Sequence, residues 1–302
     1  MMDRSDTVSR IVATFSIVAH DPQNKEWGVA VQSKVLAAAS VVSWAQANAG
    51  AVATQAWANG SWGPRGLELL SRGLSAQEVV AHLVRSDENR EHRQLGMVDA
   101  NGEAAAYTGS QCLDWAGHVV GEGYTCQGNI LASQATAEAM ATRFESTAGP
   151  LSERLVDALR AAQAAGGDRR GRQSAGVLVV KEGGGYGGHT DRSIDLRVDD
   201  HQEPIEELAR LLDMHQLYFG KHEPREWVAV EGEACCFLQK LLKDTGYYDG
   251  PVDGEYTDRL QESILRFHNC ENFEEKYREG YLAAEIYRHL YRYGLKHCPP
   301  GM

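Results

Sequence analysis

Two short apolar runs near the start of the chain, residues 14–19 and 28–34, flank the polar loop 20–26 and predict a β-hairpin. Side chains alternate between the two faces of a strand, so Thr14 and Ser16 share one face of the first strand. An unpaired hydroxyl in a buried strand is unfavourable, so the hydroxyls of Thr14 and Ser16 are expected to be either hydrogen-bonded or reactive. The hydrophobic pattern therefore marks Thr14 and Ser16 as candidate functional residues.

The same pattern predicts alternating groups of strands and helices as far as residue 219. Strands are expected at 50–56, 94–99, 103–108, 117–125, 175–181 and 194–198, and helices near 67–74, from 75 onward, and over 133–146, 151–165 and 203–219. A capping box formed by Ser75 and Glu78 opens the second helix. Antiparallel hairpins with helices grouped between them are typical of an α+β fold, in contrast to a doubly wound parallel sheet.

A change of composition near residues 220–225 predicts a domain boundary. We expect a first domain over 1–222, a linker at 223–231 and a small second domain over 232–302. Apolar residues at helical spacing in the last part of the chain predict three helices there. A unit of about 70 residues is close to the lower size limit for independent folding.

The composition of the 302-residue chain is that of an ordinary globular protein, with 43% hydrophobic and 24% charged residues. The net charge of −12 and the pI near 5.4 argue against general binding of nucleic acid. The six cysteines show no paired metal-binding spacing, and no apolar run approaches the length of a membrane helix. The chain start lacks the apolar segment of a secretory signal, so a cytoplasmic location without a membrane segment is predicted.

Neither a cofactor nor a metal is expected. The glycine-rich run 183–188 lacks the Lys-Ser/Thr ending of a phosphate-binding loop. The nearest approach to a metal-ligand set is formed by His189, Asp195, Asp199, Asp200 and His201. Because Asp195 shares a strand face with Arg197, ion pairing is the favoured interpretation of this group.

Several ordered segments of the first domain resemble one protein family. They are 14–19, 28–34, 127–129 (Gln-Gly-Asn), 167–174 and 195–201. On these residues the first ~220 positions resemble the bacterial family of domains of unknown function 1028, a branch of the N-terminal-nucleophile (Ntn) hydrolase-like proteins. The resemblance implies a four-layer αββα sandwich, in which two sheets are enclosed by helices. This agrees with the α+β class expected from the order of the elements.

The resemblance also implies a catalytic group made of Thr14, Ser16, Lys34 and Asp168. If the chain were cleaved between Ala13 and Thr14, the freed α-amine would take the Thr14 hydroxyl proton, because its pKa of about 7.7–8.0 is close to neutral. Lys34 and Asp168 would support that amine. The alternative is that Thr14 and Ser16 are two strand hydroxyls satisfied by hydrogen bonds.

Further residues are candidates for holding a small-molecule or peptide-like substrate. Arg172, Gln173 and Ser174 follow Asp168 in one loop, and a guanidinium there suits an anionic or amide group. Asn59–Gly60 and Gln127–Asn129 are candidates for binding an oxyanion. The functions left open are hydrolysis of an amide or related bond and non-catalytic binding of a ligand or partner by the same fold.

The small second domain is similar to peptidoglycan-binding-like domains. The likeness is carried by 237–242, 246–250, 252–254 and the spacing of Ile264 and Phe267. It implies binding of peptidoglycan fragments, with a glycan held by Tyr247, Tyr248, Asp249 and Asp253. The alternatives are that these residues only build a turn, and that the domain is an interaction module that forms a homo-oligomer.

Overall fold

The computed structural model describes residues 14–220 and 226–294 and divides the chain into two compact units, Met1–Asp213 and Met214–Met302. The division falls inside helix α7 (Pro204–Phe219). Ala13, the chain start and residues 223–225 of the expected linker lie outside the described residues. Another part of that expected linker, Trp227–Ala229, forms a strand, β11.

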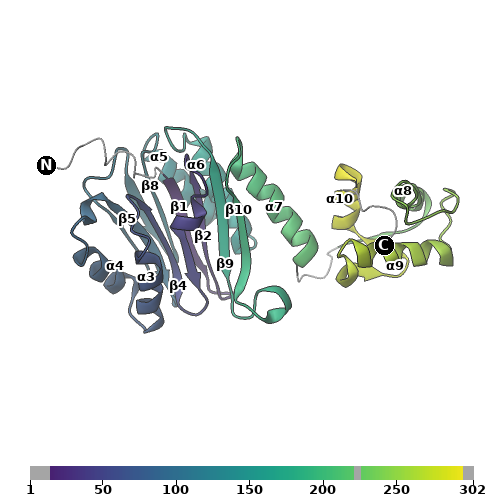
Figure 1. Cartoon of the computed structure of the whole chain (residues 1–302), viewed down its shortest axis with the longest axis horizontal. Coiled ribbons are helices and arrows are strands. Elements are labelled where there is room, and N and C mark those ends of the chain that lie inside the picture. Colours follow the sequence, from purple (N-terminus) through teal and green to yellow (C-terminus); the bar gives the residue numbers. More distant parts are fainter. Residues whose placement is uncertain (1–13, 221–225, 295–302) are drawn as a thin grey trace. The chain divides into compact units, whose positions relative to one another are not determined.

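The first unit is built around a six-stranded antiparallel sheet with β1 and β2 at its centre (Figure 1). Its strands in spatial order are β10 (Arg192–Val198), β9 (Ser174–Val180), β2 (Glu26–Ser33), β1 (Thr14–Asp21), β8 (Tyr124–Asn129) and β7 (Gly117–Gly121). β1 and β2 form the predicted hairpin, with Thr14 opposite Ser33. On the other side of β1, Thr14 is opposite Asn129.

A second, four-stranded sheet is also antiparallel. Its order is β3 (Ser43–Gln46), β4 (Gly50–Ala56), β5 (Arg93–Asp99) and β6 (Ala104–Thr108). Each strand pairs with the next one along the chain; β3–β4 and β5–β6 are joined by short turns, whereas the connection from β4 to β5 carries α3 and α4.

The remaining elements of the first unit are helices and short turns of helix. They are α2 (Ala39–Val42), α3 (Trp62–Ser71), α4 (Ala76–Arg85), η1 (Arg90–His92), α5 (Ala135–Ser146), α6 (Leu151–Ala164) and η2 (Tyr186–Gly188). The predicted capping box is present at the start of α4, where Ser75 and Glu78 exchange backbone and side-chain hydrogen bonds. Its presence explains why α4 begins at Ala76.

Three apolar clusters show how these elements pack. Val52, Leu83 and Leu95 belong to a cluster between α3, α4 and the outer face of the four-stranded sheet. The two sheets meet through a second cluster, and a third lies between the six-stranded sheet and α5, α6 and the first part of α7. Burial of each large apolar side chain contributes roughly 1.5–3 kcal/mol, so all three contacts are substantial. Figure 1 shows α3 and α4 beyond one sheet and α7 beyond the other.

The second unit combines helices with a small sheet. Its helices are α8 (Gly232–Asp244), α9 (Asp258–Cys270) and α10 (Ala284–Tyr293), with a short turn η3 (Glu274–Lys276). The sheet has the order β11, β13 (Tyr281–Ala283) and β12 (Tyr277–Arg278). The helices share one apolar core that includes Leu242, Ile264 and Phe267.

The predicted combination of antiparallel sheets and helices, followed by a helical C-terminal region, is confirmed. The small sheet was not predicted, because strands of two and three residues leave no period-2 pattern in the sequence.

Candidate active site

Thr14 is the first residue of the central strand β1, and its side chain points into the space between the two sheets. Its Oγ1 donates a hydrogen bond to Ser33 Oγ at 3.2 Å, and both side chains are fully buried. Asn129 lies opposite Thr14 on the other neighbouring strand. The strand pairing therefore brings three short polar side chains together at one end of the central strands.

Ser16 lies two residues along β1 and faces the same space. Its hydroxyl donates to Gln55 Oε1 at 2.6 Å and accepts from Gln127 Nε2 at 2.7 Å. Because Gln55 is on the four-stranded sheet, its bond to Ser16 joins the two sheets, whereas the bond from Gln127 lies within the six-stranded sheet. Gln55 Nε2 in turn donates to the Thr14 carbonyl at 3.4 Å.

Gln94 extends this network to both sheets. Its Oε1 accepts from Gln55 Nε2 at 2.8 Å and from Asn129 Nδ2 at 3.1 Å. Its Nε2 lies 2.8 Å from the Gly128 carbonyl and 2.9 Å from Thr108 Oγ1. Such buried networks rigidify a core when their members are satisfied. We call the side chains of Thr14, Ser16, Ser33, Gln55, Gln94, Gln127 and Asn129 the amide network.

The amide network retains hydrogen-bonding capacity. Within the described part of the chain, two of its atoms, Gln127 Oε1 and Asn129 Oδ1, are buried without a partner. Leaving a buried polar atom unpaired costs about 1–3 kcal/mol, so such atoms call for an explanation. The members of the network are all uncharged, which means that their polarity comes from amides and hydroxyls.

Two strained residues directly follow members of the network. Ala56, after Gln55, has φ of 63°, and Ile130, after Asn129, has φ of 53°. The left-handed region is a genuine outlier for a β-branched side chain such as that of Ile130. Each such residue costs roughly 1–3 kcal/mol and persists where the surroundings enforce it, frequently at functional sites.

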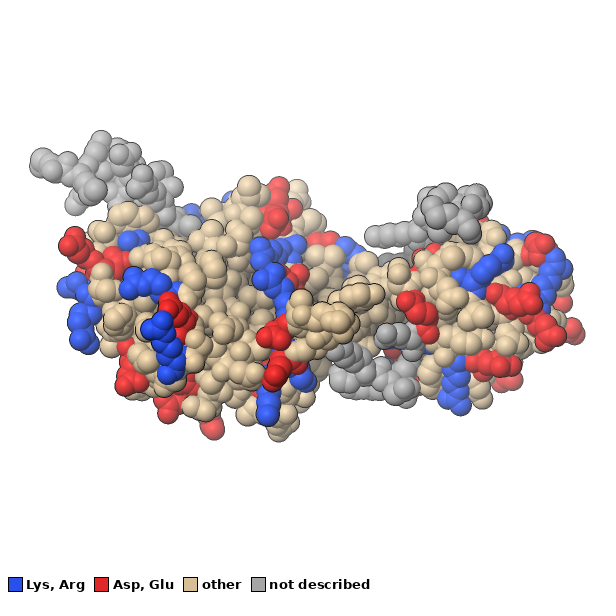
Figure 2. Space-filling view, turned by 60° about the horizontal axis from the view of Figure 1, so that its bottom comes forward, with Lys and Arg blue, Asp and Glu red and all other residues tan. Residues whose placement is uncertain are grey.

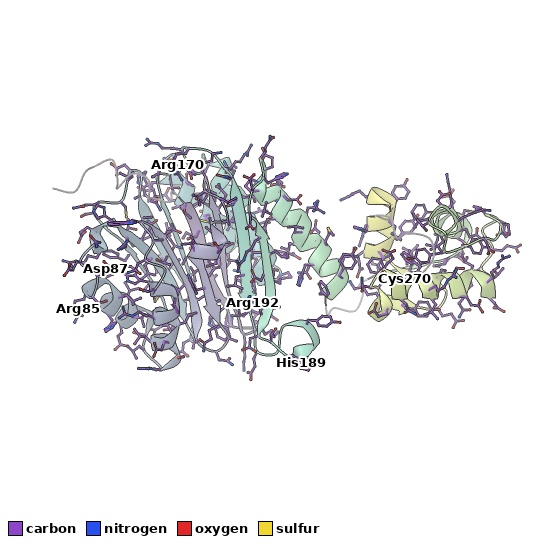
Figure 3. All side chains as sticks on the ribbon, in the orientation of Figure 1. Arg85, Asp87, Arg170, His189, Arg192 and Cys270 are labelled. Atoms are coloured by element: carbon purple, nitrogen blue, oxygen red, sulfur yellow. The ribbon has the colours of Figure 1, made fainter. Side chains whose placement is uncertain are left out.

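Asp168 fixes the loop 166–173 to the end of β2. Its buried carboxylate accepts from the Lys34 amide at 3.1 Å and from the Arg170 amide at 2.9 Å, and it pairs with the Arg170 guanidinium at 3.2 Å. Figure 3 shows Arg170 at this end of the first unit. Because the Lys34 backbone amide binds the Asp168 carboxylate, Asp168 lies beside the end of β2, one residue from Ser33.

The other residues expected near the nucleophile contact the same loop or its surroundings. Lys34 is exposed, and its Nζ donates to the Arg172 carbonyl at 3.4 Å. Arg172 pairs with Glu203, and Gln173 Nε2 donates to Asp200 Oδ1 at 3.0 Å. The buried Ser174 hydroxyl donates to the Val35 carbonyl at 2.6 Å and accepts from the Ala38 amide at 3.0 Å. The contacts of these side chains hold the loop against the β2 end.

Asn59 and Gly60 lie at the start of α3, in a different cluster. Asn59 Nδ2 donates to Asp87 at 2.8 Å, and Arg93 Nε pairs with the same carboxylate at 3.1 Å. Burial alone would raise the pKa of Asp87, but the hydrogen bonds from Asn59, the Asn89 amide and Arg93, with the Arg93 charge, hold it below the usual value. Figure 3 labels Asp87 on the α4 side. Asn59 therefore serves this ion pair and not the amide network.

In the second unit, the four residues expected to hold a glycan have separate environments. Tyr247 and Tyr248 are only 8% and 4% exposed, so their rings belong to the core. Asp253 Oδ1 accepts from the Glu255 amide and from Gln239 Nε2, and these bonds lower the pKa of its carboxyl. Asp249 is exposed and pairs with Arg259 at 2.5 Å.

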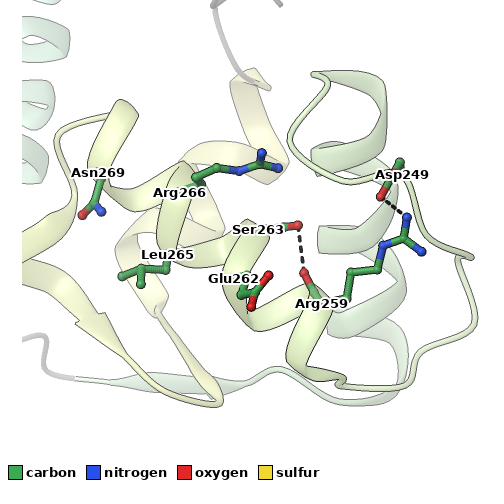
Figure 4. A pocket seen from close by; sticks show the side chains of 7 residues that line it. All are labelled: Asp249, Arg259, Glu262, Ser263, Leu265, Arg266 and Asn269. Atoms are coloured by element: carbon green, nitrogen blue, oxygen red, sulfur yellow. Dashed lines mark hydrogen bonds and ion pairs between the residues drawn. The ribbon is translucent and has the colours of Figure 1, made fainter. Parts of the chain in front are cut away.

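Asp249 lines a pocket on the surface of the second unit. The pocket has a volume of about 420 Å³ and is lined by Asp249, Arg259, Glu262, Ser263, Leu265, Arg266 and Asn269 (Figure 4). Sequence reasoning missed the α9 residues, because charged positions on the outer face of a helix are usually only solvated.

Charge and metal chemistry add little to the site. Figure 2 shows acidic and basic side chains interspersed over the visible face. Within residues 14–220 and 226–294 no group of three metal-ligating side chains is found, and no helix there is long and apolar enough to cross a membrane. Asp195 pairs with Arg197 at 2.9 Å and with Arg192 at 3.0 Å, the ion pairing favoured by the sequence.

Two family models match the chain. Residues 14–208 match the model described as "Family of unknown function (DUF1028)", and residues 218–299 match the model described as "Putative peptidoglycan binding domain". A comparison with curated proteins found no match.

Among solved structures, the chain is similar to the crystal structure of protein SPO2555 from Silicibacter pomeroyi, which is assigned to the same family of unknown function. The two are 31% identical with a TM-score of 0.62, and the match covers 69% of this chain and 91% of that one. The chain therefore belongs to the family of unknown function 1028, and it carries a peptidoglycan-binding-like domain after the family region.

Proposed function

We propose that the first unit is an Ntn-type hydrolase of an amide or related bond, with Thr14 as nucleophile. The observation that carries the proposal is the place of Thr14: it opens the central strand, and its hydroxyl faces the space between two antiparallel sheets. The order of helices, sheet, sheet and helices supports the four-layer αββα fold implied by the resemblance. The strained residues beside Gln55 and Asn129 also support a functional site at this end.

The mechanism requires that the Ala13–Thr14 peptide bond is first hydrolysed. The freed α-amine then accepts the hydroxyl proton while Thr14 Oγ1 bonds to the substrate carbonyl carbon. The substrate C–N bond breaks, the amine group returns the proton to the leaving nitrogen, and an ester on Thr14 remains. Water attacks this ester with the same amine as base, which releases the acid and restores the hydroxyl.

Neighbouring residues would orient these steps. Asn129 is opposite Thr14 across the strand pair, and the N–H of its carboxamide that is not donated to Gln94 would stabilise charge on the reacting oxygen. Gln127 and Asn129 have unpaired carboxamide oxygens that would accept N–H groups of an amide substrate. Asp168 and Lys34 would act as positioning residues, since Asp168 fixes the backbone beside Ser33. Arg172, Gln173 and Ser174 belong to the same loop end and would contact more distant parts of the substrate.

The alternative function is non-catalytic binding by the same fold. It is favoured by the complete burial of Thr14 and Ser16 and by the two hydrogen bonds that the Ser16 hydroxyl makes. In that case the amide network is a structural core between the sheets and Thr14 is never freed.

A β-lactone probe, which acylates nucleophilic hydroxyls, distinguishes the two functions. We expect the full-length protein and Thr14→Ser to gain the mass of one lactone on residue 14, and Thr14→Val to gain none. Thr125→Val is the matched control, since Thr125 is an equally buried threonine in the same sheet, and it should be labelled like the wild type. Absence of labelling in the wild type, or equal labelling of Thr14→Val, would favour the binding protein.

For the second unit we propose binding of peptidoglycan fragments, supported by the family match over residues 218–299. The test is sedimentation of the full-length protein with purified peptidoglycan, with cellulose as an insoluble glycan control. Retention by peptidoglycan alone supports the proposal, and equal or absent retention on both materials counts against it.

A further inference from the structure

The pocket of the second unit lies along the outer face of α9. Arg259, Glu262, Ser263, Arg266 and Asn269 recur at spacings of three and four residues, so they form one stripe of the helix. The opposite stripe, with Leu260, Ile264 and Phe267, is buried in the core. A volume of about 420 Å³ falls within the ~300–1,000 Å³ usual for small-ligand sites.

The wall facing α9 is the turn that carries Asp249. The turn is held in place by Tyr247, which is buried in the core and whose hydroxyl donates to Glu271 at 2.9 Å. Arg266 donates to the Tyr247 carbonyl, so one of its N–H groups is anchored to the turn. A guanidinium has five N–H donors in a planar fork, so Arg266, which lines the pocket, keeps further donors for a ligand while it is anchored.

Two guanidinium groups and two carboxylates line this pocket, which gives it no net charge (Figure 4). The ion pair of Arg259 with Asp249 joins side chains that are 58% and 81% exposed. Exposed pairs of this kind contribute about 0–1 kcal/mol, so a ligand carboxylate can replace Asp249 at little cost. Bidentate binding of a carboxylate is the geometry for which arginine is best suited.

We propose that this pocket binds the terminal carboxylate of a short peptide with small aliphatic side chains. Arg259 and Arg266 hold the carboxylate, and Glu262 and the Asn269 carboxamide accept peptide N–H groups. Leu265, which is 43% exposed, contacts an aliphatic side chain. The inference rests on the proposed peptidoglycan-binding role and deepens it, because it names the peptide part of peptidoglycan as the group that is recognised.

Stacking of a sugar on Tyr247 and Tyr248 does not fit the burial of their rings. Stacking needs accessible aromatic faces, and the two tyrosines of the predicted glycan site are in the core. The polar groups around the pocket instead match the donors and acceptors of a peptide terminus.

The test is calorimetric titration of the full-length protein with acetyl-Ala-Ala-D-Ala, either as the free acid or as the C-terminal amide. The free acid should bind at least about tenfold more tightly, since charge-assisted hydrogen bonds are lost in the amide. Arg259→Ala should weaken binding of the acid by at least about tenfold, and Arg259→Lys by less. Arg288→Ala removes an equally exposed arginine of the same unit that does not line the pocket, and it should leave the affinity unchanged.

A second arm replaces the last residue by L-alanine, which separates a cell-wall source from ordinary peptides. Tighter binding of the D-form supports the cell-wall peptide, and equal binding of both forms keeps the carboxylate site but assigns it to peptides in general. Equal affinity for acid and amide, or an equal loss in Arg288→Ala, overturns the inference. Retention of the wild-type protein on peptidoglycan without any binding of the peptide acid overturns the pocket while the wall-binding role survives.

Discussion

Gly96 and Gln127 meet in the space between the two sheets, where a Cβ atom on residue 96 would lie 2.1 Å from Gln127 Oε1. Two non-bonded heavy atoms cannot come this close, so an alanine at position 96 would force the Gln127 carboxamide out of its present position. Since Gln127 also donates to Ser16, the glycine on one sheet permits a hydrogen bond within the other.

We expect Gly96→Ala to displace Gln127 and destabilise the first unit by about 1–3 kcal/mol, as overpacking of a core does. Urea denaturation measures the loss. The matched control is Gly60→Ala, because a Cβ at Gly60 meets no atom within 4 Å. A variant at residue 96 that is as stable as the control would contradict this packing.

Gln94 is the centre of the amide network, and its replacement by the similarly shaped Met should leave several buried partners unpaired. The expected loss is about 2–4 kcal/mol, since each unpaired group costs about 1–3 kcal/mol. Gln46→Met changes an exposed glutamine of the same sheet and should alter the free energy of unfolding by less than about 0.5 kcal/mol. Similar values for the two variants would mean that the network contributes nothing to stability.

The buried pair of Asp87 and Arg93 predicts a pH-dependent stability. Because the pKa of Asp87 is lowered in the folded protein, its contribution is present above the unfolded pKa near ~3.9 and is lost as the pH falls through the folded value. Asp87→Asn should therefore be less stable than the wild type at pH 7, by about 3–5 kcal/mol. Denaturation at pH 7, 5 and 3 should show this difference shrinking only at the most acidic pH. A difference independent of pH would exclude the charge of Asp87 as its source.

His118 joins the edges of the two sheets, with Nδ1 at 2.8 Å from Thr108 Oγ1. The side chain of His118 is exposed at the sheet edges, but partial desolvation of its ring lowers the pKa of His118 below 6.5, so the unfolded chain takes up this proton first. Stability should therefore decline as the pH falls below about 6.5, and less so in His118→Gln. An NMR titration of the ring measures the pKa directly, and a value at or above 6.5 would contradict the prediction.

The sequence predicts those parts of the fold that depend on local patterns. The hairpin of β1 and β2 and the capping box at Ser75 follow from alternation and capping chemistry, whereas the pairing that puts Thr14 opposite Asn129 is known only from the structure. Gln55 and Gln94 were missed because a single polar residue at the end of an apolar strand has no local signature. Only the packing of the two sheets against each other brings Gln55 to Ser16, and Gln94 is linked to Ser16 through Gln55.

The same limit explains the residues whose surroundings differ from expectation. The dipeptide Asn59–Gly60 is compatible with an oxyanion-binding loop and with the start of a helix. In the structure Asn59 donates to Asp87, a residue distant in sequence, and therefore lies away from Thr14. Tyr247 and Tyr248 lie in a turn that the sequence shows as polar, yet the turn folds their rings into the core. In both cases the deciding partner is distant in sequence.

The proposed hydrolase depends on cleavage of the peptide bond before Thr14. Intact-mass measurement with N-terminal sequencing of freshly purified full-length protein tests it most directly, with Thr14→Val as the uncleaved reference. The proposed hydrolase predicts a chain that starts at Thr14 in the wild type and an uncut chain in Thr14→Val. A wild-type chain that retains the residues before Thr14 would contradict the mechanism.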